Sequence, residues 1–219
     1  MDKESPTMTP FKYAHSDADG WAGIARGLVE GLLSGEDLTH DDGESLLGFL
    51  YVTDVIAEDV GSILTYLRQT TGIDDWVGTV GMGVCATGVE FFGRPAAVAM
   101  AVRLPEDSFC VFPAILDDID EFTAAGKAWI EAASPPFGIV HGDPNNKRSM
   151  EIIEGLGVVT FGFLVGGLTA SRSAHPQIAG DITGGGVSGV FFAPGIEVAT
   201  GLTQGCLPVG STHVVSDCL

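Results

Sequence analysis

Two segments in the first half of the chain place apolar residues at the spacing of an amphipathic helix. In residues 17–34 the apolar positions are Trp21, Ile24, Ala25, Leu28, Val29 and Leu32. In residues 57–72 they are Val60, Ile63, Leu64 and Leu67, and Gly72 supplies a stop signal. Because such positions share one face of a helix, both segments are predicted to be helices that pack against a core.

Continuous apolar runs predict strands that are covered on both faces. One run, 46–54, lies between the two helices, and three more follow the second helix at 76–88, 96–105 and 108–116. After a third predicted helix at 120–133 the order returns. A strand at 137–143 and a helix at 144–157 precede strand candidates at 159–171, 185–193, 196–204 and 212–217.

This recurrence indicates a duplicated unit, because TVGMGVCATG and FLVGGLTASR occupy the same place in each half. We expect a single domain, 1–219, with pseudo-repeat units at about 17–116 and 119–219. The predicted fold class is α/β (mixed α+β). Two strand-helix-three-strand units form mixed sheets flanked by helices, as an αββα-like sandwich.

The formal net charge of −19 comes without any cluster of lysine or arginine, so nucleic acid and anionic membranes are poor partners. No apolar run reaches the 18 or so residues that span a bilayer, and the first residues do not resemble a secretory signal. The four cysteines form no C-x-x-C pair, which favours buried thiols over a zinc site or disulfides. We expect a cytoplasmic protein without a bound metal.

Glycine-rich strand ends carry the candidate chemistry. Cys85 and Cys206 lie at equivalent edges of the two units, as cavity-lining residues or as small buried fillers, since no base accompanies either thiol. His141 ends a strand, where ligands often bind in α/β folds, or it is a structural histidine. Asp54 and Asp143 end matching strands and have the chemistry of helix caps.

Arg172 is the only basic residue in the last 71 positions and follows the apolar strand at 160–168 directly after Ser171. Its guanidinium either neutralises a buried carboxylate or holds the carboxylate of a ligand through its bidentate fork. The string GGGVSGV at 184–190 lacks the lysine and the following helix of a nucleotide-binding loop. Ser188 within it does not form a G-x-S-x-G nucleophile elbow.

The succession WVGTVGMGVCATGVEF, IVHGDP, FLVGGLTASR, GGVSGV and GLTQGCLPVGSTHVV resembles the amino-terminal domain of the FIST family, from about Phe11 to Val215. The resemblance implies an intracellular sensory input domain of bacterial signalling that binds small ligands such as amino acids. It also implies partners such as a kinase or another output module, or a carboxyl-terminal FIST domain. That second domain usually follows, whereas this chain ends at Leu219, so a ligand site shared between the two would be incomplete.

The expected function is therefore a non-enzymatic small-molecule sensor that binds a small carboxylate ligand, without a cofactor. The string at 201–215 is expected to form a strand, a turn and a returning strand, with Gln204 and Cys206 lining a pocket. The alternatives are a haem-binding gas (nitric oxide) sensor, with His141, His175 or His213 as axial ligand, and a thiol- or serine-dependent hydrolase. The expected ligand-binding residues are Cys85, His141, Ser171, Arg172, Gln204 and Cys206.

Overall fold

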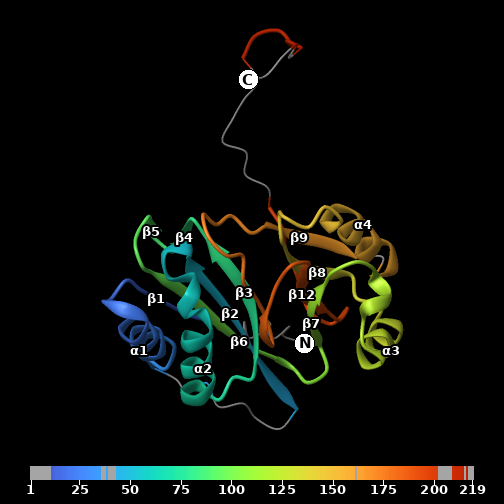
Figure 1. The fold of residues 1–219 in the computed structure, drawn as a ribbon. Coiled ribbons are helices and arrows are strands. Elements are labelled where there is room, and N and C mark those ends of the chain that lie inside the picture. The colour runs from blue at the N-terminus through green and yellow to red at the C-terminus, as the bar shows by residue number, and fades with distance from the viewer. Residues whose placement is uncertain are drawn as a thin grey trace, which may run out of the picture.

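The fold is a four-layered αββα sandwich (Figure 1). A computed structural model describes residues 11–35, 38, 43–160, 162–201, 209–214 and 216. Helices α1 (Gly20–Leu32) and α2 (Val60–Thr71) cover the outer face of one sheet. Helices α3 (Ala124–Ala133) and α4 (Ser149–Thr160) cover the outer face of the other sheet. The predicted fold class is confirmed.

The first sheet has six strands in the order β1-β6-β2-β3-β10-β11. Strands β2 and β3 run parallel, as expected when a helix connects them, and β6 is antiparallel to β2. The bounds of these strands are β1 (Lys12–Ser16), β2 (Glu44–Thr53), β3 (Asp75–Gly81), β6 (Ala97–Pro105), β10 (Gln177–Ala179) and β11 (Asp181–Thr183).

The second sheet repeats the first four strands of the first sheet, in the order β7-β12-β8-β9. Its parallel pair is β8 with β9, and β12 is antiparallel to both β8 and β7. The interpretation of the run 108–116 as the last strand of the first unit is therefore wrong, because β7 pairs with β12 and opens the second sheet. The bounds are β7 (Phe109–Ile115), β8 (Phe137–Gly142), β9 (Phe163–Leu168) and β12 (Val187–Phe192).

A hairpin sits at the same place in each half of the chain, between the second parallel strand and the returning strand. In the first half it is β4 (Gly83–Ala86) with β5 (Val89–Phe92), and in the second it is β10 with β11. The second hairpin joins the sheet of the first half, because β10 pairs antiparallel with β3. The pairing of β10 with β3 connects the two halves of the chain.

Among the described residues, most of the core lies in three apolar layers. Alternate residues of β2 separate two of them: Leu46, Leu50 and Val52 face α1 and α2, whereas Leu47 and Phe49 face the second sheet. The third layer lies under α3 and α4, around the stacked rings of Phe112 and Phe191. This division explains why the strand runs are apolar on both faces.

Short turns of 3-10 helix, η1 (Asp54–Asp59) and η2 (Ile119–Glu121), precede α2 and α3. The pattern missed β1, whose five residues are too short and too polar to register as an apolar run. Within the described part of the carboxyl-terminal segment, the strands predicted at 196–204 and 212–217 are wrong, because residues 196–201, 212–214 and 216 form no strand. The rest of both runs lies outside the described residues.

Candidate functional site

The two halves of the chain meet where their parallel strands end. Gly81, the last residue of β3, forms a parallel bridge to Ala170, just beyond β9. Beside it the hydroxyl groups of Thr79 and Thr169 share a hydrogen bond of 2.7 Å. Carboxyl ends of parallel strands are the usual place for ligands in α/β folds. This junction therefore has the usual position of a ligand site.

A cavity of about 300 Å³ opens at this junction, and we call it the junction cavity. Both halves contribute, and its only thiol among the described residues is that of the exposed Cys85 on β4. The lining offers two threonine hydroxyls, a phenol, the thiol and apolar surface, which suits a small polar molecule. Its residues are Tyr51, Thr79, Val80, Gly81, Gly83, Val84, Cys85, Leu168, Thr169 and Ala170.

Tyr51 connects the junction cavity to His141. The two residues hold equivalent positions on β2 and β8, since each follows the residue that pairs with the matching glycine, Gly78 or Gly166. The Tyr51 hydroxyl and His141 Nε2 share a hydrogen bond of 3.1 Å. Burial raises the pKa of Tyr51 to about 12 and lowers the pKa of His141 to about 4, so both side chains are neutral at pH 7.

The second nitrogen of that imidazole is unusual. His141 Nδ1 is buried and has no hydrogen-bond partner among the described residues. Buried polar atoms are rarely left in this state because the missing bond costs about 1–3 kcal/mol. The Tyr51–His141 pair is therefore a polar element that has an unused donor or acceptor between the sheets.

Arg172 lies two residues beyond the cavity wall and is held by Asp54. Its backbone N and its Nε donate to Asp54 Oδ2 at 2.8 Å, and its Nη2 donates to Oδ1 at 2.6 Å. The Asp54 side chain is 2% exposed, whereas that of Arg172 is 53% exposed. These hydrogen bonds lower the pKa of the Asp54 carboxyl to about 2. Of the two roles considered for Arg172, neutralising a buried carboxylate is the one that the contacts show.

Asp54 is therefore not the helix cap that its position suggested, since Thr53 and Asp59 hold the cap positions of η1 and α2. Asp143 accepts a hydrogen bond from the backbone N of Asn145 at 2.8 Å, six residues before α4 begins. It closes a local turn and does not cap the helix. The capping interpretation is thus wrong for both residues.

The Asp54–Arg172 pair predicts a specific loss of stability in acid. Because the folded-state pKa of Asp54 lies below its usual value, its contribution is present above about pH 4 and fades toward pH 2. We expect the stability difference between the native protein and an Asp54→Asn/Arg172→Gln variant to shrink over this range in urea titrations. Asp181→Asn is the control, because Asp181 pairs with Arg68 but is 89% exposed. A difference that stays constant down to pH 2.5 would contradict this assignment.

The structure brings only some of the predicted site residues together. Cys85 lines the junction cavity, and His141 reaches it through Tyr51. Ser171 Oγ lies 3.4 Å from Ser173 Oγ, and neither lines the cavity. Gln204 and Cys206 lie outside the described residues. That the predicted site residues bind one ligand stays a prediction, because Tyr51 connects His141 to the cavity whereas Arg172 is not part of its lining.

Sequence reasoning missed Tyr51, Thr79 and Thr169. The signal for Tyr51 was available, because it holds in the first repeat the place that His141 holds in the second. The two threonines gave no signal, since their contact joins residues 90 positions apart.

Two alternative chemistries were considered from the sequence. The hydrolase alternative needs an accessible nucleophile, but Ser188 on β12 is buried. Its Oγ donates to Gln177 Oε1 at 2.7 Å, which is a structural contact within the core. For haem, His175 Nδ1 lies 3.3 Å from the Asn145 side chain, and His213 is exposed. None of the three proposed axial ligands lines the junction cavity, so the haem alternative stays a prediction that no contact of these residues favours.

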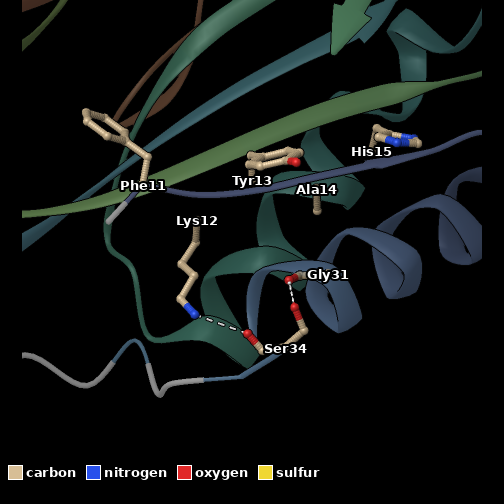
Figure 2. Close-up of a pocket in the computed structure, with 7 residues that line it drawn as sticks. All are labelled: Phe11, Lys12, Tyr13, Ala14, His15, Gly31 and Ser34. Carbon is tan, nitrogen blue, oxygen red and sulfur yellow. Dashed lines mark hydrogen bonds between the residues drawn. The ribbon is translucent and has the colours of Figure 1, made fainter. Parts of the chain in front are cut away.

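A larger hollow, of about 430 Å³, lies beside the edge strand β1 (Figure 2). Figure 2 shows Lys12 and Ala14 on the side of α1, with Phe11, Tyr13 and His15 on the opposite side. Lys12 Nζ donates to the Ser34 carbonyl at 3.1 Å, and Ser34 Oγ donates to the Gly31 carbonyl at 2.7 Å. These bonds tie the edge strand to the end of α1, so the hollow is a groove at the sheet margin.

Comparison with family models decides the family. The model of the FIST N domain matches residues 46–218, which is well over half of the chain. The chain belongs to the FIST family. FIST domains are sensory, non-catalytic domains of signal transduction, as the sequence resemblance implied.

The FIST match begins at β2 and includes every residue of the junction cavity. Searches of curated proteins and of solved structures found no match. Among the described residues, no helix is long and apolar enough to cross a membrane.

Proposed function

We propose that this FIST domain is the small-molecule input of a bacterial signalling protein and that its ligand binds in the junction cavity. The observation that carries the proposal is that residues of both repeats line this one cavity at the ends of β3 and β9. A ligand there contacts both halves at once, so its binding energy can change how they pack. This is what a sensor domain requires.

The proposed ligand is a small carboxylate such as an amino acid. Arg172 has five N–H donors, and Asp54 uses two of its side-chain N–H groups. The remaining donors belong to a guanidinium that Asp54 fixes in place and that is half exposed. Such an arrangement holds a carboxylate with little loss of side-chain entropy. Thr79, Thr169 and Cys85 provide polar contacts for the rest of the molecule.

The proposed setting is the cytoplasm, where the ligand signal passes to a kinase, another output module or a carboxyl-terminal FIST domain. No cofactor or metal is part of the proposal. We also propose that the domain has no hydrolytic turnover, because neither Cys85 nor Ser188 is hydrogen-bonded to a base among the described residues.

Calorimetric titration with amino acids and with the corresponding amino acid amides tests the ligand class. The carboxylates are expected to bind and the amides to bind much more weakly. Arg172→Lys keeps the charge beside Asp54 but loses the planar fork, and it is expected to weaken carboxylate binding about 10-fold or more. The control is Arg148→Gln, which removes a partly exposed arginine that pairs with Glu151 at the start of α4 and lies outside the cavity lining. Equal binding of acids and amides would overturn the carboxylate proposal.

A further inference from the structure

A second cavity, of about 340 Å³, lies between the inner faces of the two sheets, and we call it the inter-sheet cavity. Strands β2 and β6 form one wall, strands β8 and β12 form the other, and the segment after β12 lies at the rim. Nearly every lining side chain is apolar. The lining consists of Phe11, Phe49, Tyr51, Met100, Val102, Leu104, Phe137, Ile139, Phe192, Ile196, Glu197, Val198 and Ala199.

The two hairpins pack differently around this space. Hairpin β10-β11 lies against β12 and β7 and pairs with β3, so it closes one side of the space between the sheets. Hairpin β4-β5 packs on Tyr51 and Val98 of the six-stranded sheet, and within the described residues its strands pair only with each other. Residues of β6 and β8 both line the cavity, whereas no residue of hairpin β4-β5 does.

Incomplete closure leaves core side chains within reach of solvent. Met100, Leu104, Phe137 and Ile139 point into the layer between the sheets but are only partly buried. Protein interiors are close-packed, and apolar voids of this size are few. Phe11, which directly precedes β1, adds to the lining, and Figure 2 shows its ring on the side of the chain away from Lys12. This cavity is therefore a preformed apolar pocket that is open on one side.

One polar element is placed against this apolar space. Tyr51 lines the inter-sheet cavity and shares its hydrogen bond with the buried His141, whose Nδ1 has no partner among the described residues. Among the described residues of the lining, Glu197 carries the only charged side chain, and it is exposed. Together with the net charge of −19, this carboxylate disfavours an anionic occupant.

We propose that the inter-sheet cavity binds an uncharged aromatic molecule about the size of two fused rings, with a single polar group that meets Tyr51. An apolar cavity of about 150 Å³ accepts one benzene ring, and this cavity has about twice that volume. It is too small for a helix or a strand of a partner protein. The site is separate from Arg172 and its ligand differs in charge, so the proposal goes beyond the carboxylate sensor.

The test uses 2-naphthol as the probe and 2-naphthoate as its anionic counterpart, titrated at pH 7.5 with ligand-observed NMR and calorimetry. We expect 2-naphthol to bind and 2-naphthoate to bind at least 10-fold more weakly. Ile139→Trp and Met100→Trp each place a large side chain in the cavity and are expected to abolish naphthol binding. Val158→Trp is the control, because Val158 is exposed on α4 and outside the lining.

Ile139→Trp and Met100→Trp are both used, so that the test still works if one of them fails to fold. A cooperative urea unfolding transition shows which variant is folded. Naphthol binding that survives in a folded cavity variant would overturn the proposal, as would equal binding of the naphthoate. Sedimentation of the same proteins checks a competing occupant. If the native chain dimerises and the cavity variants are monomeric, the space is an interface between copies and the proposal is wrong.

Discussion

Replacing Gly78 with alanine is expected to lower the free energy of unfolding by about 4 kcal/mol or more, one of the largest single-residue effects in this fold. Gly78 lies in β3 with a φ of 155°, and an added Cβ would overlap the carbonyl oxygen of Leu50 on β2. Strand β10 pairs on its other side, so the backbone has no direction in which to move. For a chain of this length the melting temperature should fall by about 10 °C or more.

Gly166 gives a matched second variant because it is the equivalent residue of the second repeat. Its φ is 136°, and an added Cβ would overlap the Val140 carbonyl oxygen. Among the described strands β9 pairs only with β8, so this strand can shift outward. Gly166→Ala is therefore expected to destabilise the fold less than Gly78→Ala.

Gly157→Ala is the control for both substitutions. In α4 an added Cβ meets nothing within 4 Å, and alanine favours a helix by about 1 kcal/mol over glycine. Thermal unfolding should therefore move upward for this variant and downward for the other two. A Gly78→Ala protein that melts within a few degrees of the native chain would contradict the pairing geometry of β2 and β3.

The layers of this fold were predictable because they depend on local patterns. The helices at 17–34 and 57–72 were predicted from the spacing of their apolar residues, and Gly72 ends α2 in the left-handed conformation, as expected of a stop signal. The apolar runs predicted strands that are buried on both faces. A repeated order of elements was enough to indicate two related units and an αββα sandwich.

The partners of the strands were not predictable in the same way. Nothing in the run 108–116 says that it pairs with β12 across the chain and not with its neighbour β6. Similarly, the exchange of β10 into the other sheet depends on an edge that β3 leaves open. Which strands pair depends on how whole sheets pack, and the sequence of a single segment does not contain this information.

The site shows the same limit. His141 and Arg172 were singled out by residue type, but their partners Tyr51 and Asp54 lie 90 and 118 residues away in the chain. Asp54 has the residue type and position of a cap, and the local signal therefore favoured capping over a distant ion pair. The duplication offered a long-range clue, since Tyr51 and His141 hold equivalent positions in the two repeats and share a hydrogen bond.

The burial of His141 has a measurable consequence, because it makes the stability of the fold depend on pH. The folded-state pKa is about 4, against 6.5 for an exposed imidazole. Between these two pH values His141 is protonated in the unfolded chain but neutral in the folded chain. Its contribution to the free energy of unfolding is therefore fully present above about pH 6.5 and is lost as the pH falls to about 4. The loss attributable to this residue is about 3 kcal/mol.

A His141→Gln variant removes this titration while it keeps a side chain that can share a hydrogen bond with Tyr51. Urea unfolding at pH 7.5, 6, 5 and 4 should therefore show the native protein losing about 3 kcal/mol more than the variant over this range. Carboxylates that titrate in the same range affect both proteins equally and cancel in the difference. His213→Gln is the control, because it removes an exposed imidazole. If the native protein and His141→Gln lose stability in parallel from pH 7.5 to 4, then His141 is not buried as a neutral imidazole, and the polar element assigned to the inter-sheet cavity is not there.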